Sequence, residues 1–104
     1  MTTFDKREEA FEKKFAHDEE MRFKLTARRN RLFGEWVAER LGKSGEAAKA
    51  YATEVVLADF EEIGDDDVLR KVRQDLGAAG LAVTDAELRA KLDELERTAK
   101  LQPT

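Results

Sequence analysis

The chain has 104 residues, 41% of them hydrophobic and 40% charged, which is enough for a single modest core. Its net charge of −4 excludes a general nucleic-acid binder, because neutralising phosphates requires a dominantly basic surface. Cysteine is absent, which excludes disulfides and thiolate metal sites. The sequence also lacks the long uncharged apolar run that would predict a membrane-spanning helix. We therefore expect a cytosolic protein that binds neither nucleic acid nor the bilayer directly.

The residue pattern predicts an all-α fold. The only proline is Pro103, strand-like runs of β-branched and aromatic residues are missing, and apolar residues recur with helical spacing. Glycines at positions 42, 45, 64, 77 and 80 lie near the ends of these segments, where left-handed caps are expected. We expect a four-helix bundle-like core with a long first helix. The predicted helices cover residues 3–41, 44–63, 67–79 and 85–100.

Helix starts are marked by residues that can accept hydrogen bonds from the first turn. Thr84 and Glu87 have the spacing of a capping box for the fourth helix. Ser44 is the expected N-cap of the second helix. The run of aspartates at 65–67 supplies a cap for the third helix and negative charge at its N-terminal dipole.

Apolar residues at helical spacing define the predicted core. Alanines at 47, 48, 52 and 58 keep the second helix slim, so that its neighbours can approach closely. The predicted core residues are Leu25, Leu32, Phe33, Trp36, Val37, Tyr51, Val55, Val56, Phe60, Val68, Leu69, Val72, Leu76, Leu88, Leu92 and Leu95.

An N-terminal arm differs from the rest of the chain. Between residues 3 and 20 the only sizeable apolar side chains are Phe4, Phe11 and Phe15, which lie within ~20° of one line on a helix. The apolar line that continues through Met21 and Leu25 is rotated from it by roughly 70°, so one straight helix cannot present both stripes to one core.

The phenylalanine stripe has two interpretations. An arm that is disordered or fraying alone could fold on binding, with the three phenylalanines entering an apolar groove of a partner. Alternatively, Phe11 and Phe15 cover the open end of the bundle and the charged residues between them form a solvated face.

A basic segment follows the arm, with five cations and no acid between residues 22 and 31. It adjoins the acidic residues 18–20, and Glu20 and Lys24 have the favourable i, i+4 order for an ion pair. The segment is therefore interpreted as a charged helix face. The alternative is that Arg28, Arg29 and Arg31 dock an acidic partner, as in a helical adaptor or regulator.

No constellation of residues predicts catalysis or a cofactor. Residues 42–44 lack the preceding glycine of a phosphate loop, residues 59–70 lack two ligands of a calcium loop, and residues 77–80 end a helix instead of opening one. His17 is the only histidine, and it is interpreted as a surface residue, with pH sensing as the alternative. Without a nucleophile, base or metal set, we expect a binding protein and not an enzyme.

Residues 15–36, FAHDEEMRFKLTARRNRLFGEW, form a recognisable segment. Together with the opening MTTFDKREEAF, VVLADFE at 55–61 and TDAELRAK at 84–91, they resemble the zeta inhibitor subunit of alphaproteobacterial F-type ATP synthases. The resemblance covers the whole chain and extends to its length. It implies a core domain of residues 20–104 and an inhibitory arm of residues 1–19 that becomes helical when bound.

The resemblance further implies that the arm wedges at an alpha/beta interface beside the gamma shaft and blocks ATP hydrolysis. The protein would then be cytoplasmic, peripheral on the inner face of the plasma membrane through the synthase. Some family members are thought to bind adenine nucleotides, but no phosphate loop here assigns that site to particular residues. The expected partner-binding residues are Phe4, Asp5, Lys6, Arg7, Glu8, Glu9, Phe11, Glu12, Lys13, Lys14 and Phe15.

Overall fold

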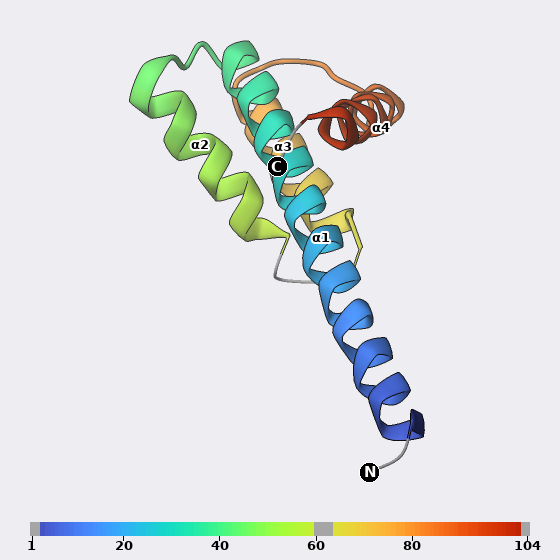
Figure 1. Ribbon diagram of the computed structural model, residues 1–104. Helices are drawn as coiled ribbons and strands as arrows, with labels where there is room; N and C mark the ends of the chain where they lie inside the picture. Colours follow the sequence, from blue (N-terminus) through green and yellow to red (C-terminus); the bar gives the residue numbers. More distant parts are fainter. Residues whose placement is uncertain (1–2, 60–63, 103–104) are drawn as a thin grey trace.

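The computed structural model describes the backbone of residues 3–59 and 64–102 and the side chains of residues 19–59 and 64–102. Within these ranges the chain forms four α-helices and no strand (Figure 1). The all-α fold and the long first helix are confirmed. The helices are α1 (Thr3–Arg40), α2 (Gly45–Ala58), α3 (Asp66–Ala78) and α4 (Asp85–Leu101).

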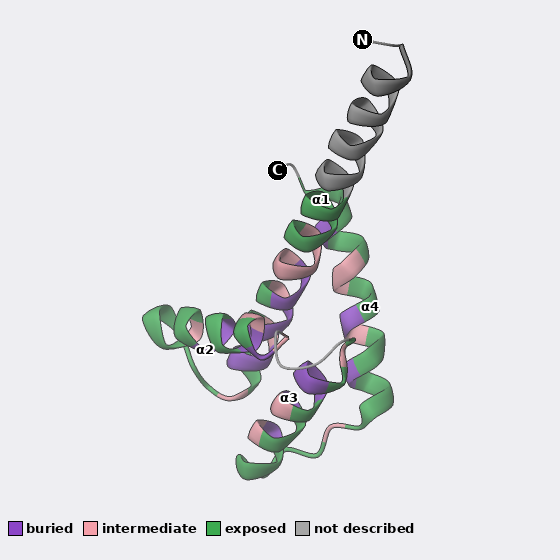
Figure 2. Cartoon of the chain, turned by 90° about the horizontal axis from the view of Figure 1, so that it is seen from below, coloured by how far each residue is buried: buried purple, intermediate pink, exposed green. Residues whose placement is uncertain are grey.

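The long helix α1 is the central element of the fold. It contacts each of the other three helices, and α2 and α4 lie on opposite sides of it (Figure 2). Helix α3 contacts α1, α2 and α4, which closes the core. At 38 residues α1 is more than twice as long as any other helix, and its N-terminal end extends beyond them (Figure 1).

Two glycines end helices as the sequence predicted. Gly80 has a φ of 76°, and the backbone N–H of Leu81 donates to the carbonyl of Leu76 over 2.9 Å, which satisfies a carbonyl of the last turn of α3. Gly42 ends α1 in the same way, with a φ of 78°. Gly77, expected as part of a cap, instead lies inside α3.

The predicted N-caps differ in outcome. Thr84 is confirmed, because its hydroxyl accepts a 3.2 Å hydrogen bond from the backbone N–H of Glu87. Ser44 occupies the N-cap position of α2 without a side-chain hydrogen bond to the helix. Asp65 occupies that position before α3 but makes no cap bond either. Its carboxylate is bound by an arginine of α1, so a tertiary contact replaces the predicted local one.

Helix α2 is shorter than predicted. The sequence pattern favoured a helix to residue 63, but α2 ends at Ala58, where the N–H of Asp59 donates to the carbonyl of Val56 over 3.3 Å. This bond spans three residues instead of the four of an α-helix, so it closes the last turn as a tighter 3₁₀ turn. The α-helix ends there. Phe60, which was predicted to join the core, lies outside the described residues.

Ten of the predicted core residues are buried, and they come from all four helices. Phe33 is fully buried, and its ring stacks on Trp36 with centroids 6.0 Å apart. The buried predicted residues are Phe33, Val37, Tyr51, Val55, Val68, Leu69, Val72, Leu76, Leu88 and Leu92. Because these residues recur every three or four positions, the helical periodicity alone identified this core.

The remaining predicted core residues lie at its edge. Trp36 and Leu95, both predicted as core positions, are partly buried and pack against the core. Leu25, Leu32 and Val56 are also only half-buried. A periodic pattern extends along a whole helix, whereas burial requires another helix opposite each turn, and α1 is longer than its partners.

Helices α1 and α2 approach each other most closely at Gly34. A Cβ atom built on Gly34 would lie 2.7 Å from the Cα atom of Ala52 and 3.2 Å from the Cβ atom of Val55. Ala52 and Ala58 are buried, which supports the prediction that alanines make α2 slim enough for close packing. Gly34, the small residue through which α1 approaches α2, was not predicted from the sequence.

Candidate functional site

The expected partner-binding residues belong to the first half of α1. The backbone of this segment continues the helix from Thr3, but the side chains of residues 3–18 lie outside the described residues. The roles given to the residues between Phe4 and Phe15 therefore stay predictions. The same holds for pH sensing by His17 and for the mobility of the arm.

The first described side chains of α1, at positions 19–24, are all exposed. Glu19 pairs with Arg22 at 3.3 Å and Glu20 pairs with Lys24 at 3.2 Å, so the i, i+4 ion pair predicted from the sequence is confirmed. Met21 and Phe23 are unusually exposed for large apolar residues, at 41% and 56%. The arm is thus joined to the core through a charge-stabilised stretch of helix with two exposed apolar side chains.

Arg29 anchors α1 to two other parts of the chain. Its side chain is only 7% exposed, and its guanidinium binds both carboxylate oxygens of Asp65, at 2.7 and 3.3 Å. Glu96 of α4 lies 3.6 Å from the same guanidinium, and the Asn30 side-chain oxygen accepts two more hydrogen bonds from it. The planar fork of donors suits this arrangement, which fixes α1 to the turn before α3 and to α4.

Arg28 performs a different structural task. Its Nη1 donates to the backbone carbonyls of Ala99 and Gln102, at 3.1 and 3.2 Å, at the C-terminal end of α4, where the helix dipole favours a cation. Two of the three arginines proposed for docking an acidic partner are therefore engaged within the chain, and only Arg31 among them is exposed. Neither sequence interpretation of the basic segment predicted these internal roles.

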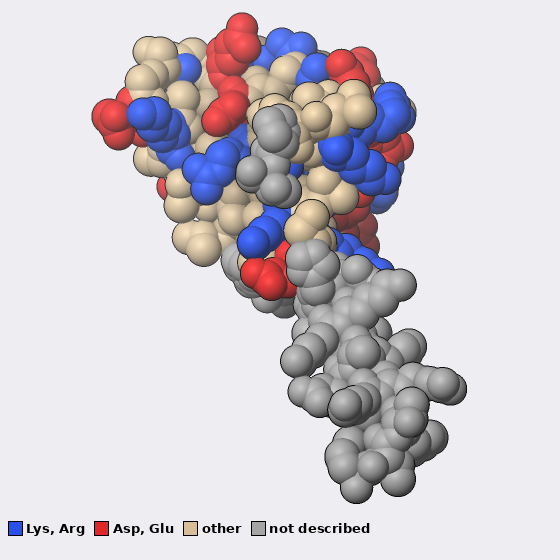
Figure 3. Space-filling view, viewed as in Figure 1, with Lys and Arg blue, Asp and Glu red and all other residues tan. Residues whose placement is uncertain are grey.

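Acidic and basic side chains are interspersed over the face of the core seen in Figure 3.

The pKa of one acidic residue near the Arg29 anchor is shifted. Burial raises the pKa of Asp59 above its ordinary value of 3.8, the carboxylate of Asp67 acts in the same direction, and Arg29 opposes both. Its position directly after α2 is also unfavourable for a negative charge, because helix carbonyls point toward it.

Replacing Asp59 by asparagine is expected to make the protein more stable at pH 7. The folded state disfavours the ionised carboxyl, so the stability contributed by this group is present at low pH and lost as the pH rises through the raised pKa. The gain should disappear below about pH 3, where the carboxyl is protonated in both states. Urea denaturation at pH 3 and pH 7 measures it, with Asp93→Asn, an exposed acid of α4, as the control. Equal effects of both substitutions would contradict the prediction.

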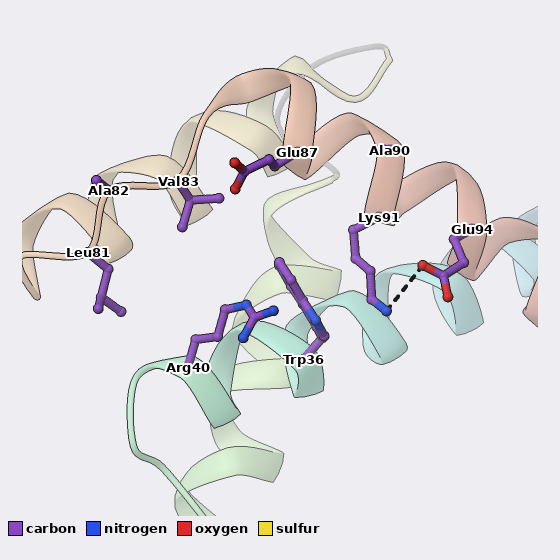
Figure 4. A pocket seen from close by; sticks show the side chains of 9 residues that line it. All are labelled: Trp36, Arg40, Leu81, Ala82, Val83, Glu87, Ala90, Lys91 and Glu94. Carbon is purple, nitrogen blue, oxygen red and sulfur yellow. Dashed lines mark hydrogen bonds and ion pairs between the residues drawn. The ribbon is translucent and has the colours of Figure 1, made fainter.

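A cleft of about 690 Å³ lies between the end of α1 and the start of α4 (Figure 4). Trp36 forms one wall, with the Arg40 guanidinium carbon 4.1 Å and the Lys91 ammonium nitrogen 5.6 Å from its ring centroid. Lys91 also pairs with Glu94 at 3.2 Å. The cleft thus combines an aromatic ring with two cations and two acids, Glu87 and Glu94, so its lining carries no excess of positive charge.

This cleft was missed in the sequence because its walls come from distant segments. The i, i+4 spacing of Trp36 and Arg40 was the one available signal. Gly42 ends α1 and so does not open a phosphate-binding turn. Across residues 19–59 and 64–102, no cluster of histidine and acidic side chains has the geometry to hold a metal ion.

Comparison with known proteins shows which family this chain belongs to. The family model described as ATPase inhibitor subunit zeta matches residues 1–102. The chain belongs to this family. A solved solution NMR structure is 57% identical, with a TM-score of 0.69, over 77% of this chain and 91% of that one. Among curated proteins no sequence matches the chain.

Membership in the zeta family agrees with the resemblance seen in the sequence. It identifies the chain as an ATPase inhibitor subunit, which is a regulatory role. None of the helices, so far as they are described, is both long and apolar enough to cross a membrane.

Proposed function

We propose that the chain blocks ATP hydrolysis by the F-type ATP synthase, by inserting residues 1–19 as a helix at an alpha/beta interface beside the gamma shaft. The observation that carries this proposal is the match to the ATPase inhibitor subunit zeta family over residues 1–102, a range that includes the whole arm. The alpha, beta and gamma subunits of the catalytic head are the proposed partners. Through them the chain would be peripheral on the inner face of the plasma membrane.

The geometry of α1 supports this mechanism. The helix begins at Thr3, and its first described side chains, at positions 19–24, are exposed. Only farther along do Arg28 and Arg29 bind the end of α4 and the turn before α3. A helix held at one end by a compact core can present its other end to a partner without unfolding that core.

Inhibition of this kind requires no chemistry from the chain. A catalytic interface that must close in each cycle is blocked when a helix occupies it. In this mechanism Phe4, Phe11 and Phe15 supply the apolar anchors, since a few large buried side chains carry most of the energy of an interface. The charged residues among them orient the helix and tune its rate of association.

Replacing Phe4, Phe11 and Phe15 together by alanine is expected to abolish inhibition. Anchor residues cost about 2 kcal/mol or more each when truncated, so even partial additivity weakens binding more than a thousandfold. The measurement is ATP hydrolysis by a purified, zeta-depleted catalytic head as each protein is added. The control is Leu57→Ala, which removes an exposed apolar side chain from α2. Circular dichroism establishes that both variants are folded.

Three outcomes are informative. Inhibition by the native chain and by Leu57→Ala, but not by the triple variant, supports the proposal. Equal inhibition by all three would remove the arm from the mechanism. No inhibition by the native chain would refute the inhibitory function itself.

A further inference from the structure

A groove with an apolar floor and a charged rim lies next to the residues that follow the arm. The C-terminal end of α4 reaches α1 close to where the coloured part of α1 begins in Figure 2. Between them is a groove of about 320 Å³, with Met21, Leu25 and Ala99 as its apolar members. Leu101, next to it in the chain, is 86% exposed. We call this surface the cationic groove, after the residues of its rim.

Among the described residues, the rim carries four cations and no acid. They are Arg22, Lys24, Arg28 and Lys100, and Gln102 is the other polar residue. This concentration of positive charge stands out on a chain whose net charge is −4.

Three of the four rim cations, Arg22, Lys24 and Lys100, can contact a ligand without giving up a tertiary contact. Arg22 and Lys24 pair with neighbouring glutamates, but both pairs are exposed, and such pairs contribute at most about 1 kcal/mol and can exchange partners. Lys100 has no ion pair within the described residues. Arg28 is held in place by the α4 carbonyls that it caps, so its charge stays at the rim.

We propose that the cationic groove binds an acidic, amphipathic segment of the ATP synthase catalytic head. This inference rests on the proposed inhibitory function. The volume suits one or two apolar side chains, and the rim suits carboxylates on either side of them. The groove begins at Met21, two residues after the end of the 1–19 arm, so a head that receives the arm brings its neighbouring surface to the groove. The two contacts together hold the inhibitor more tightly than the arm alone.

The first test removes charge from the rim. Arg22→Gln with Lys100→Gln takes away two of the four cations and changes the net charge from −4 to −6 (−4 − 2 = −6). The control, Lys49→Gln with Arg97→Gln, makes the same change elsewhere. It is closely matched, because Lys49 pairs with Glu46 at i, i+3 as Arg22 does with Glu19, and Arg97 lies on α4 like Lys100.

The readout is the concentration that half-inhibits ATP hydrolysis by the zeta-depleted catalytic head. We expect the groove variant to need about tenfold more protein than the control at low salt, with a smaller difference at high salt. Equal values for the two variants would overturn the inference while leaving the arm mechanism intact. Failure of the native chain to inhibit would instead refute the proposed function, and the groove inference with it.

The second test identifies the chemistry of the partner. A carbodiimide joins lysine amines directly to carboxylates, so the native complex should yield cross-links from Lys24 or Lys100 to aspartate or glutamate of the head. Mass spectrometry locates them. Cross-links confined to lysines outside the groove, such as Lys49, would overturn the proposal. So would groove-dependent self-association in sedimentation experiments, which would assign the surface to a second copy of the chain.

Discussion

Replacing Arg29 by alanine is expected to lower the free energy of unfolding by about 3 kcal/mol. The guanidinium is buried and binds Asp65, Glu96 and Asn30, so its loss removes two ion pairs and leaves a cavity between α1, α4 and the turn before α3. The cost stays near the lower end of the range for buried pairs, because Asp65 and Glu96 are about 40% exposed and regain water. The melting temperature should fall by more than 10 °C.

Two companion variants make this prediction specific. Arg31→Ala removes an exposed arginine from the same helix and should change stability by less than about 0.5 kcal/mol. Arg29→Lys keeps the charge but not the fork that binds both oxygens of Asp65, and should lie between the two. Urea denaturation followed by the fluorescence of Trp36, the only tryptophan, measures all three. If Arg29→Ala were no more destabilising than Arg31→Ala, the Arg29 anchor would not contribute to stability.

The same substitution at two glycines is expected to have opposite effects. Gly34→Ala should destabilise the protein by about 1–2 kcal/mol, because the new methyl group would lie 2.7 Å from the backbone of Ala52 and push α1 from α2. Gly77→Ala should stabilise it by about 0.5–1 kcal/mol, because nothing lies within 4 Å and alanine favours the helix. The gain in helix propensity is common to both substitutions, so the difference of about 1.5–3 kcal/mol between their effects on stability measures the close approach of α1 and α2.

Urea denaturation of the two variants beside the native chain gives this difference directly. Gly34→Ser, which has a side chain of similar size but weaker helix propensity, should be at least as destabilising as Gly34→Ala. Stabilisation by Gly34→Ala would mean that α1 and α2 can separate at no cost. That result would contradict the close packing at Ala52.

Local signals predicted most of the fold. The Thr84 N-cap of α4 and the glycine ends of α1 and α3 depend on residues a few positions apart, and the structure contains them. The end of α2 was predicted wrongly because its apolar spacing continues past Ala58. The chain leaves the helix there to reach the turn where Asp65 meets Arg29, and no local pattern reports that contact.

The candidate sites were predictable only in part. The phenylalanine stripe is a local pattern of spacing, so the sequence alone predicts a binding arm there. The roles of Arg28 and Arg29 are different, since their partners lie 71 and 36 positions away in the chain. A run of cations looks the same in a sequence whether each charge faces water, caps a helix or pairs in the interior. The cationic groove likewise exists only because the end of α4 meets α1.

The continuity of α1 makes the chain a lever. Between Arg28, where the helix is fastened to the end of α4, and Thr3, where it begins, the axis is about 38 Å long. A tilt of about 5° at the fastened end would displace the other end by about 3 Å, which is enough to move a side chain out of its pocket. If residues 1–19 act as the proposed inhibitory helix, the packing of α1 on the core sets their direction, and substitutions at Gly34 or Arg29 would change that direction without contacting them.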